Sequence, residues 1–281
     1  MISNLKIKKR IFIVGAARSG TTLLQSMIAS HPEIYSFPET HFFTDTIPVH
    51  VWQRPFKLHG RKDRIFVSSY LRRINAGKFE NLLPDVTMSN KRWTRGLLSI
   101  LDALALENGA SIWLEKTPMH LYYIDVITSV DPNAIFIHTI RNGEDVVASI
   151  YDVSHKKPEF FGGERTIDQC ITRWKYDVKI SSNYARVVNH FIIKYESLVE
   201  SPEMVLKSLF KHLDIVWSEA ALDYKSKAAK LTFPEEAWKA KNTGEIQVAK
   251  KFDTIFSHEE QHYIRKELSK ASTQKIDENA L

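Results

Sequence analysis

Short apolar runs alternate with longer stretches of helical periodicity along much of the chain. The apolar runs predict strands at residues 11–14, 34–37, 111–114, 134–140 and 191–194. Helical patterns lie between and after them, at residues 21–30, 120–130, 142–150, 166–188 and 202–213. Nearly continuous apolar runs are typical of parallel strands that are covered on both faces, and the alternation of strand and helix is typical of α/β proteins. We therefore predict an α/β fold with three layers, α/β/α, around a central parallel sheet.

Two regions depart from this alternation. Residues from about 45 to 108 are rich in aromatic residues and arginines, and predict short helices such as 65–74 and 93–107. We interpret this region as a helical cap insertion, and as a reasonable place for a pocket. Residues from about 214 to 281 predict C-terminal helices and a segment that covers a bound ligand. Because no linker rich in glycine, serine or proline interrupts the chain, we expect residues 1–281 to form one domain.

The first predicted strand runs into a loop that is bracketed by Gly15 and Gly20. Such a loop, followed by a helix, offers backbone N–H groups and the positive end of a helix dipole to an anion. The residues expected to contact the anion are Ala17, Arg18, Ser19, Gly20, Thr21 and Thr22. The spacing matches the phosphate-binding pattern G-x-x-x-x-G-K-[ST], except that Thr21 stands in place of the lysine. The loop therefore suits a phosphate or phosphosulfate group better than the γ-phosphate of a nucleoside triphosphate.

The overall charge is compatible with such a site but does not identify its ligand. The chain carries 39 Lys and Arg against 33 Asp and Glu, a net charge of +6, which suits an anionic ligand, an acidic substrate or a nucleic acid. The single cysteine, Cys170, excludes an internal disulfide and a cysteine-based metal cluster. The first ten residues are polar and basic, and no apolar run is long enough to span a bilayer. We therefore expect a cytoplasmic protein without a membrane span.

Polar side chains follow each of the later strands. Glu39 and His41 follow the second strand, Lys116 the third, Arg141 the fourth and Tyr195 the fifth. Because the carboxyl ends of parallel strands meet at one edge of a sheet, we expect these residues near the anion loop. A plainer interpretation remains for each of them: ordinary loop residues for Glu39 and His41, a surface ion pair for Arg141, and a structural role for Tyr195.

Taken together, the motifs resemble a known enzyme family. They are R-S-G-T-T-L at residues 18–23, H-P-E-I at 31–34, Glu39, K-T-P at 116–118, and the segment 141–149, which begins with Arg141 and ends with Ser149. This set is similar to the sulfotransferases that use 3′-phosphoadenosine-5′-phosphosulfate (PAPS). It is most similar to the branch with the tyrosylprotein sulfotransferases and many bacterial homologues. The resemblance covers roughly residues 10–40 and 111–203.

The resemblance implies a P-loop fold, PAPS as donor, 3′,5′-adenosine bisphosphate as product, and no required metal. It implies that the loop amides and the hydroxyls of Thr21 and Thr22 hold the 5′-phosphosulfate. Arg141 and Ser149 would hold the 3′-phosphate. The family's C-terminal clamp on the nucleotide has no ordered match in this chain, and Lys250 is the residue that we assign to it.

The resemblance also implies roles in catalysis. Arg18 and Lys116 would stabilise the charge on the sulfuryl and bridging oxygens, while Tyr195 would pack near the nucleotide. Cytosolic sulfotransferases use the histidine of a K-T-H motif as general base, but here Pro118 stands at that position. Glu39 matches the glutamate that the tyrosylprotein branch uses, so we predict that it is the base. His41 is the reserve candidate for the base, and His120 is a weaker one.

Other functions remain open at this point. One alternative is a P-loop kinase or other phosphotransferase, but Thr21 in place of the P-loop lysine argues against it. Another is a non-catalytic polyanion-binding protein, which would use the arginines and aromatic side chains of residues 50–95. A degenerate family member would bind the nucleotide without transferring a group. We favour a sulfotransferase that acts on a hydroxyl (or amine) of a glycan, lipid, phenol or other small molecule, with a peptide tyrosine also open. Nucleic acid is not an expected partner, and the sequence does not indicate the oligomeric state.

Overall fold

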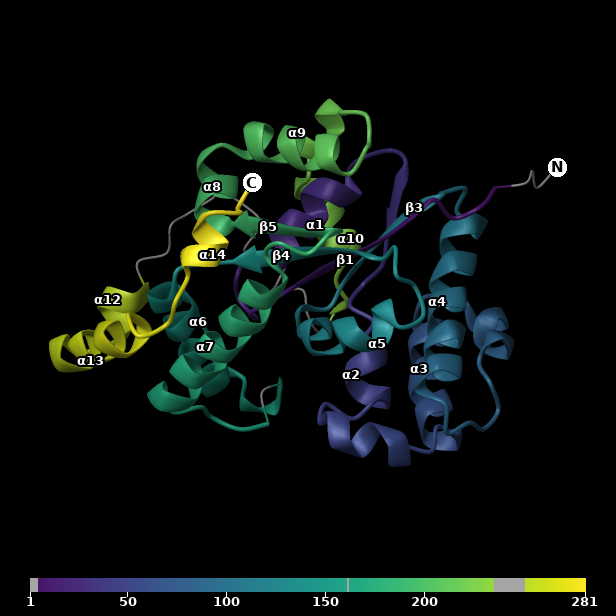
Figure 1. Cartoon of the computed structure of the whole chain (residues 1–281), viewed down its shortest axis with the longest axis horizontal. Coiled ribbons are helices and arrows are strands. Elements are labelled where there is room, and N and C mark those ends of the chain that lie inside the picture. Colours follow the sequence, from purple (N-terminus) through teal and green to yellow (C-terminus); the bar gives the residue numbers. More distant parts are fainter. Residues whose placement is uncertain (1–4, 161, 235–250) are drawn as a thin grey trace.

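The computed structural model describes residues 5–160, 162–234 and 251–281 (Figure 1). The strands are β1 (Lys9–Gly15), β2 (Ile34–Ser36), β3 (Ile112–Lys116), β4 (Ile135–Ile140) and β5 (His190–Lys194). The α-helices are α1 (Thr21–Ala29), α2 (Phe42–Thr46), α3 (Arg61–Arg73), α4 (Asn90–Glu107), α5 (Ile124–Thr128), α6 (Gly143–Lys156), α7 (Ile167–Tyr184), α8 (Tyr195–Glu200), α9 (Pro202–His212), α10 (Lys225–Lys230), α12 (Lys251–Ile255), α13 (His258–Leu268) and α14 (Gln274–Asp277). Short 3-10 helices are η1 (Val51–Phe56), η2 (Gly77–Leu82), η3 (Pro118–Tyr123), η4 (Pro158–Phe160) and η5 (Glu219–Leu222).

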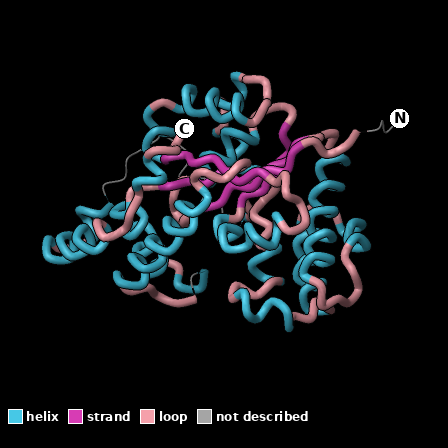
Figure 2. The backbone as a smooth tube through the Cα atoms, in the orientation of Figure 1, coloured by secondary structure: helices cyan, strands magenta, loops and turns pink. Residues whose placement is uncertain are grey.

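The five strands form one parallel sheet in the order β2-β3-β1-β4-β5. In the central strand, Ile11 pairs with Leu114 of β3 on one side and with Ile135 of β4 on the other. Helices α1 and α9 cover one face of the sheet, and α5, α6 and α7 cover the other (Figures 1 and 2). The predicted three-layer α/β fold with a central parallel sheet is therefore confirmed.

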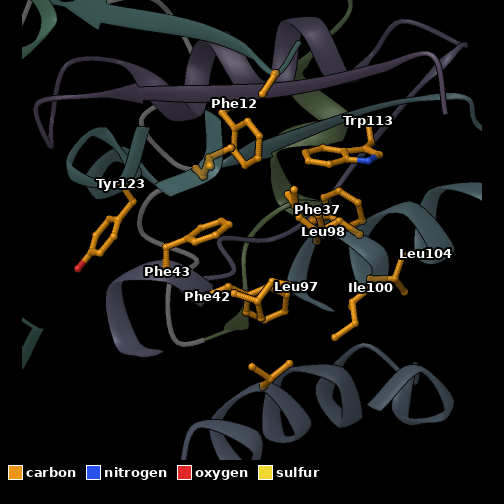
Figure 3. Packing of buried hydrophobic residues seen from close by; sticks show 14 of the residues in the cluster. Phe12, Phe37, Phe42, Phe43, Leu97, Leu98, Ile100, Leu104, Trp113 and Tyr123 are labelled. Atoms are coloured by element: carbon orange, nitrogen blue, oxygen red, sulfur yellow. The ribbon is translucent and has the colours of Figure 1, made fainter. Parts of the chain in front are cut away.

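The side chains of β1 alternate between two cores, as the pleat of a strand requires. Phe12 packs on the face that carries α2 and α4, where its ring lies 5.2 Å from that of Trp113 and 6.4 Å from that of Phe43 (Figure 3). Ile11 and Ile13 point to the opposite core, which they share with α1 and α9. Because both faces are covered, every residue from Ile11 to Gly15 is buried, and the strand delivers its last residues rigidly to the loop.

The order of the strands corrects one expectation. The sequence predicts that the second strand ends beside the anion loop, whereas β3 lies between β2 and β1 in the structure. Residues that follow β2 therefore reach the loop across the carboxyl end of β3. The hydrophobic pattern indicates which segments are strands, but the lateral order depends on how the crossover helices pack, which the pattern does not contain.

Several element boundaries also differ from the predicted ones. The helix predicted over 120–130 begins earlier, as η3 at Pro118, because proline fits the first turn of a helix. The helix predicted over 166–188 ends at Tyr184, and the chain then turns into β5 through Asn189, whose backbone is left-handed. The strand predicted over 191–194 begins one residue earlier, at His190, and ends at Lys194 as predicted, where Tyr195 opens α8.

Between β2 and β3 the chain passes through α2, η1, α3, η2 and α4, and α3 and α4 lie side by side at one end of the molecule (Figure 1). Within the described residues, no helix is both long and apolar enough to cross a bilayer.

Candidate anion site and catalytic centre

The carboxyl ends of the parallel strands bring the predicted site residues together at one edge of the sheet. Two groups of contacts form there. In one group, Arg18 contacts Ser149, and Tyr195 contacts both Gly20 and Arg141. In the other group, Lys116 contacts Glu39 and Thr22, and Glu39 contacts His41. The loop from residue 15 to residue 22 joins the two groups, since it contributes residues to both.

The anion loop depends on its two glycines for close packing. A Cβ on Gly15 would lie 2.4 Å from the backbone oxygen of Thr139, and a Cβ on Gly20 would lie 2.2 Å from the ring of Tyr195. Both glycines have positive φ angles, 141° and 83°, which favour glycine. Arg18 also has a positive φ, 73°, and a non-glycine residue in that region costs about 1–3 kcal/mol. Such strain is typical of a loop whose shape serves a site.

Helix α1 begins directly after the loop and points its first turn toward the site. Gly20 occupies the N-cap position and offers no side-chain cap to the first amides of α1. The N–H groups of a helix's first turn have no partner within the helix, so they remain available to an anion. Thr21 and Thr22 add hydroxyl groups in this first turn.

Two guanidinium groups lie close together beside the loop. The Nε of Arg18 donates to Ser149 Oγ at 3.1 Å, and Arg141 lies over the ring of Tyr195, 4.4 Å from its centroid. Burial and the positive charge of Arg141 lower the pKa of Arg18 below its ordinary value. Asp145 offsets part of this charge through an ion pair with Arg141 at 3.2 Å.

Two buried polar atoms at this place lack a hydrogen-bond partner among the described residues. They are the Nε of Arg141 and the Oγ of Ser19. Buried donors are nearly always satisfied in folded proteins, so each of these two calls for an explanation. An anionic ligand with several oxygen atoms supplies acceptors for both, and the residues present therefore fit a phosphate-bearing ligand.

Glu39 is held between two side chains at the end of β3. One of its carboxylate oxygens accepts a hydrogen bond from the Nζ of Lys116, and the other lies 3.3 Å from the Nε2 of His41. Lys116 is buried and lies 3.4 Å from Thr22 Oγ1, so it connects the carboxylate to the first turn of α1. Glu39 retains a small exposed area, and His41 is half-buried. The centre thus combines a carboxylate, a lysine and an imidazole within contact distance of the loop.

A second carboxylate, Glu115, supports this centre from the protein interior. It is fully buried, and one of its oxygens accepts hydrogen bonds from the hydroxyls of Thr40 at 3.0 Å and Thr117 at 2.6 Å. Its other oxygen lies 2.9 Å from the Nδ1 of His120. Burial alone raises the pKa of Glu115, but the charge of His120 and these hydrogen bonds outweigh it and lower the pKa below its usual value.

Glu115 acts on the residues that flank Glu39. Thr40 follows Glu39 directly, and the backbone N–H of His41 donates to Thr117 Oγ1 at 3.3 Å. Glu115 therefore fixes the backbone on which Glu39 and His41 are mounted. This role was not predicted from the sequence, because Glu115 stands next to Lys116 at the end of β3, where charged residues are commonly exposed.

A cavity lies among chain segments that follow His41 and Met119. It has a volume of about 930 Å³ and is lined by residues 44–50 with Lys57, by Met119, Tyr122 and Tyr123, and by residues of 165–176 on and just before α7. Glu39, His41 and Lys116 are not among its described lining residues, but Thr44 follows His41 by three residues and Met119 follows Lys116 by three. The hydroxyl of Tyr122 donates to Asp177, and that of Tyr123 donates to the backbone oxygen of Ile47. The hydroxyl groups of these two tyrosines are thus already satisfied.

Two of the residues predicted for the site do not lie in the two groups of contacts described above. His120, the weaker reserve for the general base, is fully buried and contacts Glu115, which argues against this role. Lys250 lies outside the described residues. Ala17, Ser19 and Thr21 lie in the loop and at the start of α1, as predicted.

The fold and the loop define the class of protein: an α/β protein with a P-loop-like arrangement of strand, glycine-bracketed loop and helix. Within that class, the chain belongs to the sulfotransferase family, whose sequence model matches residues 10–219. A protein-tyrosine sulfotransferase of Drosophila melanogaster is 26% identical over 220 residues, which are 76% of this chain and 40% of that protein. The chain spans about half the length of the curated relatives that it matches.

Solved structures share the fold at low identity. The sulfotransferase domain from the curacin biosynthetic pathway is 19% identical, with a TM-score of 0.62 over 94% of this chain and 98% of that domain. Mouse sulfotransferase SULT7A1, which was crystallised in complex with PAP, is 13% identical, with a TM-score of 0.56 over 99% of this chain and 88% of that protein. These likenesses agree with the fold described above.

The network around Glu115 leads to a prediction about stability. Because the pKa of Glu115 is lowered in the folded state, its charge contributes stability that is fully present above the unfolded-state pKa, near 4.5, and is lost as the pH falls through the folded-state pKa. We expect Glu115→Gln to reduce the free energy of unfolding by about 1–3 kcal/mol at pH 7. The difference from the unchanged protein should shrink as the pH falls from about 4.5 to 3.

Urea denaturation at a series of pH values measures this difference. Glu203→Gln, which removes an exposed carboxylate paired with Lys207, is the control and should change the free energy of unfolding little. A Glu115→Gln deficit that stays constant between pH 7 and pH 3 would contradict the assigned role of the charge.

Proposed function

We propose that the chain is a sulfotransferase that moves a sulfuryl group from PAPS to an acceptor hydroxyl or amine. The observation that carries the proposal is the pair of like charges, Arg18 and Arg141, held together beside the anion loop and the first turn of α1, which has no side-chain cap. Adjacent guanidinium groups repel each other, and the nearby carboxylates offset this repulsion at Arg18 only in part, so a bound anion would stabilise the site. Membership of the sulfotransferase family and the PAP bound to a structural neighbour support PAPS as that anion.

The donor carries two separated anionic groups, and the site offers two sets of donors. The loop amides, with Thr21 and Thr22, would hold the 5′-phosphosulfate, while Arg141 and Ser149 would hold the 3′-phosphate. The contact between Arg18 and Ser149 is compatible with this assignment. Ser149 Oγ accepts from Arg18 and keeps its own O–H free to donate to a phosphate oxygen. One guanidinium would therefore link the two anion positions through a shared serine.

Bound PAPS supplies an activated sulfuryl group and a stable leaving phosphate. For transfer, Glu39 would accept the proton of the acceptor hydroxyl as the acceptor oxygen forms its bond to sulfur and the sulfur–oxygen bond to the phosphate breaks. Arg18 and Lys116 would stabilise the negative charge on the sulfuryl and leaving oxygens, as cations do in phosphoryl transfer. In this mechanism, charge neutralisation falls to the two side chains and no metal ion is invoked.

The acceptor would occupy the 930 Å³ cavity, whose lining includes Thr44, three residues after His41. Tyr122, Tyr123 and Tyr176 contribute to its wall, and the hydroxyls of the first two donate to protein partners. Such a wall favours an acceptor with an apolar or aromatic body, such as a phenol, over one that presents only hydroxyl groups. A peptide tyrosine has such a phenol, and relatives are named protein-tyrosine sulfotransferases.

The donor assignment predicts a clear ligand preference. A thermal-shift titration should give a large stabilisation with 3′,5′-adenosine bisphosphate and little with ATP and Mg²⁺, because no lysine follows the loop. We expect Arg141→Ala to weaken bisphosphate binding about 10- to 100-fold, since a hydrogen bond to a charged group contributes about 1.5–3 kcal/mol. Arg186→Ala, which removes an exposed arginine, is the control and should bind as before. Stronger stabilisation by ATP would instead favour a phosphotransferase.

The identity of the base can be tested separately from donor binding. We expect Glu39→Gln to bind the bisphosphate normally and to lower kcat about 10²- to 10⁴-fold with an identified acceptor, as loss of a general base does. His41→Asn, which removes the neighbouring imidazole, should lower kcat much less. Initial rates of both variants at saturating donor decide the question. A large loss with His41→Asn and near-normal turnover with Glu39→Gln would assign the base to His41.

A further inference from the structure

Exposed apolar side chains gather in one part of the described chain. Nine of the seventeen large apolar side chains that are exposed lie between residues 49 and 88. We call six of them the apolar patch: Val51, Trp52, Phe56, Leu58, Val86 and Met88. Trp52 and Phe56 are the most exposed aromatic residues among them, at 70% and 77%. Contiguous apolar surface of this kind is uncommon on a soluble domain unless something binds to it.

Backbone geometry brings the two segments of the apolar patch together. His59 and Thr87 form an antiparallel bridge, with backbone hydrogen bonds of 2.8 and 3.0 Å. His59 is buried and stacks on Trp93, so its strand neighbours point to the other side, toward solvent. Leu58 and Met88 therefore face outward opposite each other. Val51, Trp52 and Phe56 precede Leu58 in η1, which lies below α2 at the end of the molecule away from the sheet (Figure 1), and Val86 directly precedes Thr87.

Positive charge surrounds the apolar patch. Residues 50–95 contain eleven Lys and Arg and only three Asp and Glu, a net charge of +8 in a chain whose total is +6. Four of these cations stand in the first turns of two helices: Arg61 and Lys62 in α3, and Lys91 and Arg92 in α4. All four are exposed, and in the described part of the chain none of them forms an ion pair.

Helix stability does not explain this placement. The N-terminal end of a helix carries partial positive charge, so cations in the first turn are unfavourable there. The two helix starts follow directly on the two segments of the apolar patch, since Arg61 comes three residues after Leu58 and Lys91 three residues after Met88. Cations and apolar side chains thus occupy the same end of the molecule, and in an isolated soluble protein both placements are energetically unfavourable.

We propose that this surface binds an anionic lipid bilayer. The aromatic and aliphatic side chains of the apolar patch enter the interface, and the four cations lie at the level of the lipid phosphates. Nucleic acid offers phosphates too, but it is bound through stacking and cations and gives no reason to expose Val51, Leu58, Val86 and Met88. The aliphatic residues therefore favour a bilayer as the partner.

Binding to a bilayer does not require the sulfuryl transfer proposed above, but the two sites are neighbours. Val49 and Lys57, on either side of η1, line the 930 Å³ cavity. A bilayer against the apolar patch lies beside one wall of that cavity. Acceptors dissolved in or attached to the membrane reach the cavity from this side.

Vesicle co-sedimentation of the chain of 281 residues tests the proposal. We expect binding to vesicles of phosphatidylglycerol and phosphatidylcholine, weak binding to phosphatidylcholine alone, and weaker binding at high salt. The double variant Trp52→Ser/Phe56→Ser should bind at least about tenfold more weakly, and so should Arg61→Glu/Lys62→Glu. The matched controls Val188→Ser/Val216→Ser and Lys266→Glu/Lys275→Glu change exposed residues elsewhere and should bind like the unchanged protein.

Each variant is also checked for an unchanged bisphosphate-induced thermal shift, which shows that the fold and the anion site are intact. A further arm replaces the vesicles by a single-stranded DNA oligonucleotide. Equal sedimentation of patch variants and unchanged protein, absence of binding to anionic vesicles, or binding to DNA tighter than to vesicles would each overturn the proposal. If the unchanged protein shows no thermal shift with the bisphosphate, the proposed donor site is contradicted, but the proposed membrane-binding surface is not.

Discussion

The like charges of Arg18 and Arg141 beside the anion loop are the constraint on which the site depends. Both guanidinium groups are brought there by rigid elements, Arg18 by the loop after β1 and Arg141 by the end of β4. Their repulsion, the left-handed backbone of Arg18 and the unpartnered Nε of Arg141 all oppose folding. A dense sheet with apolar cores on both faces holds these features in place. The fold thereby keeps positive charge ready for an anion that neutralises it.

Side chains of alternating charge extend from the anion loop into the protein interior. Lys116 faces Glu39, and Glu115, the residue before Lys116, turns to the opposite side and bonds to Thr40 and Thr117. Neighbouring residues of a strand point to opposite faces, so one strand end supplies both the lysine at the centre and the carboxylate behind it. The candidate base is thus fixed at its side chain by Lys116 and at its backbone through Glu115.

Much of the fold and part of the site could be predicted from the sequence. Apolar runs located the strands, and the rule that parallel strands end at one edge placed Glu39, Lys116 and Arg141 near the loop. Lateral strand order could not be predicted, since it depends on helix packing, and so Glu39 reaches the loop across β3. The role of Glu115 was not predicted, because the sequence alone does not distinguish a buried charged residue at a strand end from an exposed one. The exposure of Trp52 and Phe56 likewise depends on how the segment between β2 and β3 folds.

A structure of the chain in complex with 3′,5′-adenosine bisphosphate tests the central claim most directly. One phosphate should lie against the backbone amides of residues 17–22, and the other within hydrogen-bond distance of Arg141 and Ser149. The ring of Tyr195 should lie next to the nucleotide, and the Nε of Arg141 should have gained an acceptor. A bisphosphate bound away from the loop, or a complex in which Arg141 contacts neither phosphate, would contradict the account.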